Sequence, residues 1–439
     1  MGYPQAIDAP ATAVVPFRGK TLFEKLDDPR IALDPEGRDA DFIVVPYPHS
    51  VAGAETQGSL AQMLAGALSP DELQRAAAGL ATLVFDASAE GDPHRASWTD
   101  WAHAGFADLG VSPSGVVLVT QERNYADDYG AHAETRGWTD RMEVAFYDLW
   151  IKRFHAQFEG NGERRFRQRR RAFEARAAGR SRRFISLNLT ARAMKVLFLL
   201  RVLKDGLWDA GYISFGGFDR RINEFEPDAN VVRRGATDFL QEKLGSPAGF
   251  QDMVAELRPW LEALEAKGRT FLGEVSQDET GRVNKTPVKD GKLEAYDDSW
   301  FTVVTETEMR DRPSRITEKP FRALANFHPL IVLGNPGSLR MIREFGYRTF
   351  SGAIDESYDE EPDPRRRFDM VYAEFLRLCR LDDADLARFE AGLHETLAHN
   401  ARWALVEMPR IYREQRDTAL VDLLLAVRER SRTRGARAG

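Results

Sequence analysis

The sequence predicts an α/β protein with two Rossmann-like domains that face a cleft, followed by a helical C-terminal segment. The chain has 439 residues, which is more than one domain usually contains and suits two. Short apolar runs alternate with helical segments in both halves of the chain, as expected for parallel sheets. Most of these runs are continuously apolar, which indicates strands covered on both faces.

The first domain, residues 1–150, is expected to contain four strands. They are residues 42–46, 82–86, 115–120 and 142–147. Between the first two, Ser69 and Pro70 open a helix that reaches Leu80, with Ser69 as the cap and Pro70 in the first turn.

Residues 151–183 form a predicted helical connector that is rich in arginine. Ten arginines lie between Arg164 and Arg183. A solvated helix face is the interpretation we favour for them, and a surface for an anionic partner is the alternative.

The second domain, residues 184–363, begins with a strand–helix–strand unit at 184–188, 191–204 and 211–215. Further strands are expected at 300–305, 330–333 and 347–350, with helices at 318–327 and from Ser338. The polar segment 268–298 between these parts is expected to be an exposed excursion. Residues 364–430 are predicted to be helical, in the segments 364–380, 382–400, 403–413 and 418–430, and the basic tail 431–439 is expected to be disordered.

Composition and charge exclude several classes of protein. A net charge of −7 argues against general binding of nucleic acid. The single cysteine, Cys379, excludes an intramolecular disulfide and fits a reducing compartment. No apolar run approaches the roughly 20 residues that span a bilayer, and no export signal is visible, so we expect a cytoplasmic protein.

Residues 317–320, Thr-Glu-Lys-Pro, open the helix that follows the strand at 300–305. Thr317 can cap this helix, and the free backbone N–H groups of a first turn favour an anion. Lys319 adds a mobile positive charge for a phosphate, and Glu318 can accept hydrogen bonds from ribose hydroxyls. Taken alone, this tetrapeptide is more often an ordinary helix start.

Two neighbouring strand ends strengthen this interpretation. Glu306 follows the strand at 300–305, and Gly334 and Asn335 follow the strand at 330–333. Because ligands of open α/β sheets bind beyond the carboxyl ends of the strands, we expect these residues to face the same cleft.

The run from residue 300 to 337, with VVTETE, ITEKPF and PLIVLGNPG, resembles the donor-binding segment of fucosyltransferase-like enzymes, glycosyltransferase family 10. The run FISLN at 184–188, followed by Arg192, also resembles a strand and helix start of that family. The segment 335–358, with GSLRMIREFGYRTF and DESYD, resembles uncharacterised bacterial and phage relatives more than authentic fucosyltransferases. The resemblance implies two GT-B-type domains, with the acceptor on the first and a nucleotide-sugar, preferably a GDP-sugar, on the second. It implies that Arg192 and Lys319 hold the donor pyrophosphate, that Glu318 holds the ribose, and that Asn188 lies in the same site. The family's Phe-Glu-Asn-Ser is replaced here by residues 304–307, Val-Thr-Glu-Thr, so the sugar is left open.

Inverting transfer needs a base that takes the proton of the acceptor hydroxyl. Glu122, just after the strand at 115–120, resembles the family's Gly-Glu-Asn step and is the first candidate, with pairing to Arg123 or helix capping as the alternative. His49, after the first strand, is the second candidate, with a loop hydrogen bond as the alternative.

We expect no metal and no cofactor beyond the nucleotide-sugar, because the Asp-rich run 382–385 reads as a helix cap. The expected partners are a nucleotide-sugar donor and a glycan or other hydroxyl acceptor. Two alternatives stay open: a non-catalytic nucleotide- or glycan-binding component of a polysaccharide assembly system, and a peripheral protein whose arginine-rich helix contacts anionic membrane.

Overall fold

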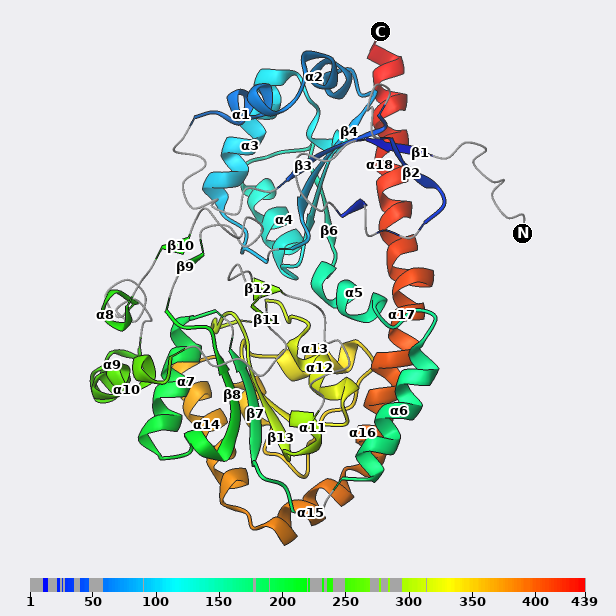
Figure 1. Ribbon diagram of the computed structural model, residues 1–439. Helices are drawn as coiled ribbons and strands as arrows, with labels where there is room; N and C mark the ends of the chain where they lie inside the picture. Colours follow the sequence, from blue (N-terminus) through cyan, green and yellow to red (C-terminus); the bar gives the residue numbers. More distant parts are fainter. Residues whose placement is uncertain are drawn as a thin grey trace. The chain divides into compact units, whose positions relative to one another are not determined.

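The computed structural model describes most of the chain and divides it into two compact units (Figure 1). Unit 1 comprises Met1–Ala156 and Pro409–Gly439, and unit 2 comprises Gln157–Met408. The described residues are 11–14, 22–23, 26, 28–34, 40–46, 58–89, 91–176, 179–188, 190–218, 220–221, 231–232, 235–239, 249–268, 276–277, 283–284, 294–312 and 314–438.

Unit 1 contains a parallel six-stranded sheet with the order β2-β1-β3-β4-β5-β6. The strands are β1 (Ala11–Val14), β2 (Ile31–Asp34), β3 (Phe42–Pro46), β4 (Thr82–Ala87), β5 (Val116–Thr120) and β6 (Glu143–Phe146). The four predicted strands are therefore confirmed, and β1 and β2 extend the sheet beyond them.

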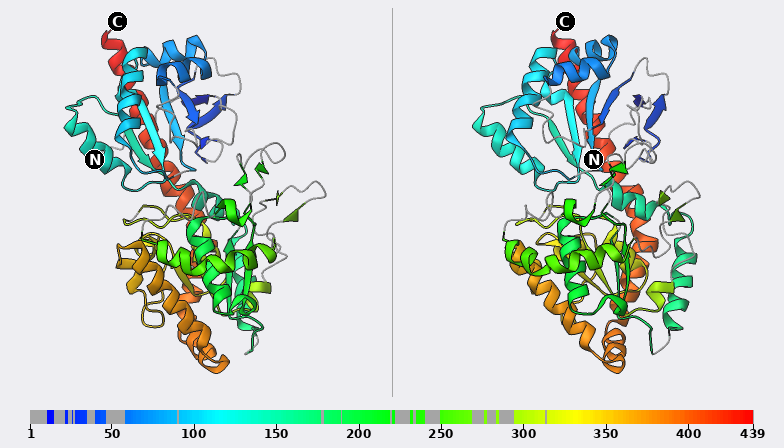
Figure 2. Two further views of the ribbon diagram at one scale, coloured as in Figure 1. Left: turned by 90° about the vertical axis from the view of Figure 1, so that its left-hand side faces the viewer. Right: turned by 60° about the vertical axis from the view of Figure 1, so that its left-hand side comes forward.

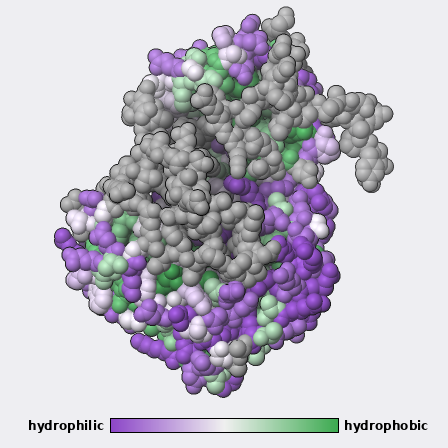
Figure 3. All heavy atoms as spheres, in the orientation of Figure 1, coloured by the Kyte–Doolittle hydropathy of each residue, from purple (hydrophilic) through white to green (hydrophobic). Residues whose placement is uncertain are grey.

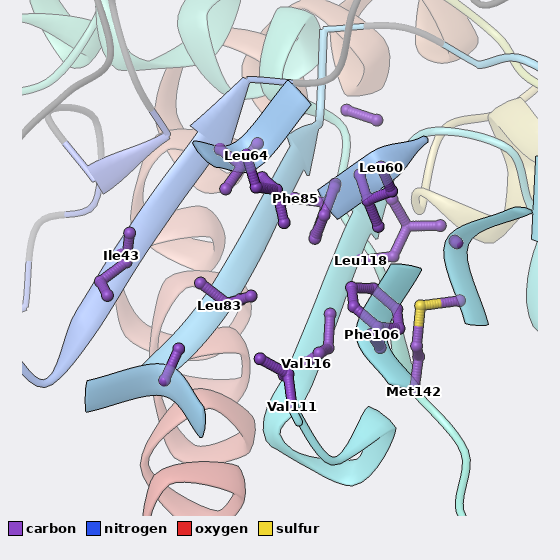
Figure 4. Packing of buried hydrophobic residues seen from close by; sticks show 14 of the residues in the cluster. Ile43, Leu60, Leu64, Leu83, Phe85, Phe106, Val111, Val116, Leu118 and Met142 are labelled. Carbon is purple, nitrogen blue, oxygen red and sulfur yellow. The ribbon is translucent and has the colours of Figure 1, made fainter. Parts of the chain in front are cut away.

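Helices cover both faces of this sheet, as the continuously apolar strands predict. On one face, side chains of the sheet pack against α1 (Leu60–Ala67), α3 (Ala96–Leu109) and α4 (Tyr125–Thr135), with Leu60, Phe85 and Phe106 in one cluster (Figure 4). On the other face, Leu420, Leu424 and Val427 of α18 (Thr418–Ala438) pack against Val84 and Val117. The remaining helices of unit 1 are α2 (Pro70–Ala77) and α5 (Leu149–Ala156). The predicted cap of α2 is confirmed, because the Ser69 side chain and Glu72 form a capping box.

Unit 2 contains a parallel four-stranded sheet with the order β14-β13-β7-β8. Its strands are β7 (Phe184–Asn188), β8 (Gly211–Phe215), β13 (Phe301–Thr305) and β14 (Leu330–Leu333). Phe375 of α14 (Pro364–Arg380) packs against Phe184, Phe301 and Phe198 of α7 (Ala193–Lys204), while α12 (Lys319–Ala325) packs against α16 (His394–Arg402). The views in Figure 2 show these helices around the sheet. The other helices of unit 2 are α6 (Gly162–Glu174), α8 (Ala236–Phe239), α9 (Gln251–Leu257), α10 (Leu261–Ala266), α11 (Glu294–Asp297), α13 (Ser338–Glu344) and α15 (Asp383–Gly392). Two short strand pairs are also present. Strand β9 (Arg220–Arg221) pairs with β10 (Val231–Val232), and β11 (Ser276–Gln277) pairs with β12 (Val283–Asn284).

The strand expected at residues 347–350 does not form. The backbone N–H of Arg348 donates to the Asn400 side chain at 2.8 Å, and the Asn400 amide donates back to the Arg348 carbonyl at 2.8 Å. A side-chain amide thus replaces the neighbouring strand that the apolar pattern suggested, while Tyr347 and Phe350 remain buried.

The C-terminal helices are present, but they belong to two units rather than one segment. The helices α14, α15 and α16 and a π-helical turn at Trp403–Glu407 lie in unit 2. A second π-helical stretch, Tyr412–Asp417, leads from α17 (Met408–Ile411) into α18, whose apolar residues complete unit 1. The predicted single segment 364–430 is therefore corrected. The expected disorder of 431–439 is corrected as well, because α18 continues through Ala438.

The connector expected at 151–183 is also divided, because α5 belongs to unit 1 and α6 to unit 2. Most of the predicted excursion at 268–298 lies outside the described residues. The α/β class, with a parallel sheet in each of two units and a helical C-terminus, is confirmed. Within the described part of the chain, no helix is both long and apolar enough to cross a membrane.

Candidate functional site

The strand order of unit 2 places a topological switch point between β7 and β13. The connection from β7 leads to β8 on one side, whereas β13 and β14 lie on the other. Ligands of open parallel sheets bind beyond the carboxyl ends of the strands at such a point. The residues that follow β7 and β13 therefore define the candidate site, which we call the switch-point site: Asn188, Arg192, Lys195, Glu306, Thr307, Thr317 and Lys319.

Glu306 and Lys319 form an ion pair at the centre of this site. Glu306 is 4% exposed, and its Oε2 lies 3.0 Å from Nζ of Lys319. Thr317 donates to the same carboxylate from its hydroxyl at 2.8 Å and from its backbone N–H at 3.2 Å. The Lys319 side chain remains 24% exposed, and its ammonium also donates to the Thr307 hydroxyl at 3.3 Å. The carboxylate is thus fixed, whereas the lysine still reaches solvent.

The pKa of Glu306 lies below its ordinary value despite its burial. Burial is the largest influence and acts to raise this pKa. The charge of Lys319 and the hydrogen bonds from Lys319 and Thr317 outweigh it, so the net direction is downward. Glu306 therefore stays ionised and holds Lys319 in place.

Gly334 allows the β14 loop to lie directly against Glu306. A Cβ atom at Gly334 would approach Cγ and Cβ of Glu306 to 3.1 and 3.2 Å, which is tighter than ordinary contact. The carbonyl of Gly334 accepts a hydrogen bond of 2.9 Å from Arg367 of α14. The predicted importance of Gly334 thus has a steric basis, which is to leave room for the Glu306 side chain.

Arg192 occupies the N-cap position of α7, whose first turn has no side-chain cap. The residue is exposed, and its guanidinium makes no hydrogen bond or ion pair with the residues that the structure describes. As far as the structure describes the chain, the 12-residue helix α7 thus begins after β7 with no side-chain cap and with a cation that has no partner. Such a helix start favours an anion.

Lys195, in the first turn of α7, is a site residue that the sequence reasoning missed. It is 5% exposed and makes no hydrogen bond or ion pair with the described part of the chain. Lys319, Glu306, Arg192 and Glu318 all lie close enough to influence its pKa. Arg192 and Lys319 both influence the pKa of Lys195, and they lie at the starts of α7 and α12, which follow the neighbouring strands β7 and β13.

Asn188 and Asn335 hold the backbone of the site rather than facing a ligand. Asn188 accepts a hydrogen bond from the Thr305 hydroxyl and donates to the Ser186 hydroxyl at 2.9 Å. Asn335 accepts a hydrogen bond of 2.7 Å from the Arg310 backbone. Both are buried, so their amides link neighbouring strand ends.

Glu318 is the N-cap residue of α12, and its carboxylate lies 3.9 Å from Arg322. Its side chain is 23% exposed, and its role in binding the ribose hydroxyls stays a prediction. The cap expected from Thr317 is modified, because the Thr317 hydroxyl donates to Glu306 while it accepts a 3.4 Å hydrogen bond from the Lys319 N–H.

Another helix start in unit 2 is already occupied by a side chain. The carboxylate of Asp359 accepts hydrogen bonds from the backbone N–H groups of Leu339 at 2.8 Å and Arg340 at 3.0 Å, in α13. An anion therefore has no free place there. A hollow of about 660 Å³ nearby is lined by Asp355, Glu356 and Arg343 among others. The carboxylates of Asp355 and Glu356 already accept backbone hydrogen bonds, from Ser357 and Phe350 respectively.

Of the two residues predicted as candidates for the catalytic base, the structure describes Glu122 but not His49. Glu122 is 1% exposed, and its Oε1 accepts hydrogen bonds from the Asn124 backbone at 3.2 Å and the Asn124 amide at 3.0 Å. It thereby braces the start of α4, as the capping alternative predicts. His49 lies outside the described residues.

Asp148, directly after β6, is a further carboxylate at the carboxyl edge of the unit 1 sheet. It is 2% exposed, its Oδ2 accepts no hydrogen bond within the described chain, and Arg416 lies 3.9 Å from that atom. Burial raises the pKa of Asp148 to about 7, and Arg123 and Arg416 only partly offset this effect. A single Asp after a strand gave no signal in the sequence, because its burial depends on the tertiary packing of the Tyr412–Asp417 stretch.

The arginine-rich stretch serves two purposes. Arg169, Arg176 and Arg180 have side chains that are 7%, 2% and 2% exposed and pair with Asp297 or Glu390. Others remain exposed on α6, namely Arg164, Arg167, Arg170 and Arg171. Figure 3 shows hydrophilic residues gathered over the side of unit 2 where α6 lies. The predicted solvated face is thus present, while part of the stretch is a buried ion-pair network.

Within the described residues, no group of three or more His, Cys, Asp or Glu side chains has an arrangement that could hold a metal ion. The Asp-rich run acts as predicted, since the Asp382 carboxylate accepts a 2.7 Å hydrogen bond from the Asp385 N–H and caps α15. Burial raises the pKa of Cys379 to about 12, so this thiol is not activated.

Comparisons with known proteins leave the family open. A scan against protein-family models finds no match, and a search of curated proteins finds none. Among solved structures, the chain is similar to the catalytic domain of starch synthase IV from Arabidopsis thaliana bound to ADP and acarbose. The two share 10% identity over 89% of this chain and 73% of that chain, with a TM-score of 0.37. A likeness at this level assigns no activity, so the function must be argued from the chain's own residues.

Proposed function

We propose that the chain is a glycosyltransferase that moves a sugar from a nucleoside-diphosphate donor, preferably a GDP-sugar, to a glycan or another hydroxyl acceptor. The observation that carries this proposal is the switch-point site. Arg192, Lys195 and Lys319 belong to the helix starts that follow the neighbouring strands β7 and β13, and the charges of Arg192 and Lys319 act on Lys195. A diphosphate has the charge and the acceptor oxygens that such a set of donors recognises.

The same groups suit the chemistry of the transfer. Negative charge builds up on the nucleoside diphosphate as the bond to the sugar breaks, and fixed cations stabilise it there. Lys319 is held by Glu306 while its ammonium still reaches solvent, and Arg192 is exposed and makes no hydrogen bond or ion pair with the described residues. These cations supply the charge that a divalent ion supplies in other transferases. Glu318, accessible at the start of α12, is our candidate for binding the ribose hydroxyls.

A panel of nucleotides tests the donor assignment. We expect GDP to raise the melting temperature of the full chain more than UDP, CMP or dTDP, because a ligand that binds the native state stabilises it in proportion to its affinity. Arg192→Ala should weaken GDP binding by about 10- to 100-fold, since a hydrogen bond to a charged group contributes about 1.5–3 kcal/mol. Arg164→Ala, on the exposed face of α6, is the matched control. Equal GDP affinity in the Arg192→Ala and Arg164→Ala proteins would contradict the assignment.

An inverting transfer also needs a base, and unit 1 carries two carboxylates at the carboxyl edge of its sheet. Glu122 is the candidate from the sequence. Asp148 is added because its Oδ2 accepts no hydrogen bond within the described residues and because its pKa of about 7 suits a general base at neutral pH. If Asp148 is the base, Asp148→Asn lowers the rate of transfer by about 100-fold or more, and the wild-type rate falls as the pH drops below 7 because the carboxylate becomes protonated. Glu122→Gln should then act mainly on stability. Full loss in Glu122→Gln, with normal transfer by Asp148→Asn, would return the role to Glu122.

A further inference from the structure

Lys195 has a position that structural needs alone do not explain. It is the third residue of α7, and side chains of a helix lean toward its N-terminus, so the ammonium lies toward the carboxyl end of β7. At 5% exposure it has lost most of its hydration, yet it has no hydrogen-bonding or ion-pair partner in the part of the chain that the structure describes. An ammonium group in such a place destabilises the unliganded protein unless a partner arrives.

The charges around Lys195 show what kind of partner is missing. Lys319 and Arg192 repel its ammonium, while Glu306 and Glu318 attract it. Glu306 is already bonded to Lys319 and Thr317, and Glu318 lies near Arg322. Three cations thus lie near two carboxylates, one of which is bonded to Lys319 and the other of which lies near Arg322, and the start of α7 adds further positive character. The three cations and two carboxylates leave a net positive charge, and an anion is the partner that balances it.

We propose that Lys195 is a third ligand of the donor diphosphate and binds it together with Arg192 and Lys319. The inference rests on the proposed function and adds a binding residue to it. The diphosphate provides the partner that the buried ammonium lacks, and the energy lost by burying Lys195 in the free protein is recovered when the donor binds.

The pKa of Lys195 makes this role visible in the pH dependence of binding. Burial, and then the charge of Lys319, lower this pKa to about 7 from an ordinary value of 10.5. Above pH 7 the free protein therefore holds a neutral amine, which must take up a proton when the diphosphate binds. Affinity for the diphosphate accordingly falls as the pH rises above 7. The charged groups that act on Lys195 are Lys319, Glu306, Arg192 and Glu318.

The test compares Lys195→Met with Lys204→Met, an exposed lysine of the same helix, by calorimetric titration of GDP at pH 6.5 and 8.5. We expect the wild type and Lys204→Met to bind GDP about 10-fold or more weakly at pH 8.5 than at pH 6.5. Lys195→Met should bind about 10- to 100-fold more weakly than the wild type at pH 6.5 and show little pH dependence. Ionisation of the GDP phosphates affects all three proteins equally, so the difference between them isolates Lys195.

Thermal unfolding of the ligand-free proteins supplies an independent readout. The folded-state pKa of Lys195 lies below its unfolded value, so the folded state loses stability as the pH falls from about 10.5 toward 7. At pH 6.5 we expect free Lys195→Met to melt above the wild type, by about 5 °C, and to gain less from GDP. Lys195→Gln, which keeps a polar end, serves if the methionine variant does not fold.

The outcomes separate the two proposals. GDP affinity and pH dependence that are unchanged in Lys195→Met or Lys195→Gln, with loss of binding in Arg192→Ala, would overturn the role of Lys195 and leave the proposed function intact. Failure of the wild-type protein to bind GDP, UDP, CMP or dTDP would overturn both.

Discussion

Replacing Lys319 by Met should abolish sugar transfer and also weaken the fold of unit 2. The change removes a phosphate ligand and leaves the carboxylate of Glu306, 4% exposed, without its ion-pair partner. Breaking a buried ion pair by removing one member costs about 3–5 kcal/mol, and the 24% exposure of Lys319 places this pair at the lower end of that range. Transfer should fall by more than about 1000-fold, because both the charge and the geometry of the site are lost.

A second substitution distinguishes these two effects. In the double variant Lys319→Met with Glu306→Gln, the buried carboxylate is removed together with its partner, so we expect most of the lost stability to return in urea unfolding. Transfer should remain lost, since the phosphate ligand is still absent. Recovery of transfer in the double variant would show that Lys319 acts only by neutralising Glu306.

Arg367→Met should have the second largest effect, although Arg367 does not belong to the switch-point site. Its guanidinium is buried and donates to four backbone carbonyls, those of Gly334, Glu361, Pro362 and Arg310. Burial lowers the pKa of Arg367 to about 10, and the nearby carboxylates only partly offset it, so the group remains charged at neutral pH. The substitution leaves several buried carbonyls without donors, at about 1–3 kcal/mol for each.

We expect Arg367→Met to lower the free energy of unfolding by about 3 kcal/mol or more and to weaken GDP binding indirectly. The loops after β13 and β14 meet at this guanidinium, and Gly334 is the residue that lies against Glu306. Arg366→Met, at the neighbouring exposed position, is the control. Unchanged stability in urea for Arg367→Met would show that water satisfies these carbonyls.

The sequence predicted the elements whose signals are local. Strands β3, β7, β8 and β14 have the expected bounds, and Ser69 and Asp382 cap their helices as their residue types suggest. Strands β1 (ATAV) and β2 (IALD) contain alanine, which favours strands only weakly, whereas β14 (LIVL), of the same length, consists of large apolar residues. The run at 347–350 has the apolar character of a strand, but its pairing depends on Asn400, which lies about fifty residues away in the chain.

Features that depend on tertiary packing could not be predicted from the sequence pattern. The apolar residues of α18 form the same sequence pattern whichever of the two sheets the helix covers. The division of the C-terminal helices between two units was therefore not predicted. Glu306 and Lys319 were expected in one site, because one follows a strand and the other begins a helix. Lys195 was not predicted as a site residue, because in the sequence it is only one charged residue at the start of an apolar helix. Its burial follows from how the start of α7 meets the ends of β7 and β13.

A structure of the full chain determined with GDP would test the central claim most directly. We predict that the two phosphates lie within hydrogen-bonding distance of Arg192, Lys195 and Lys319, with the first-turn N–H groups of α7 directed at them. Ordered GDP bound away from the carboxyl ends of β7 and β13, with these three cations still without a phosphate, would contradict the account.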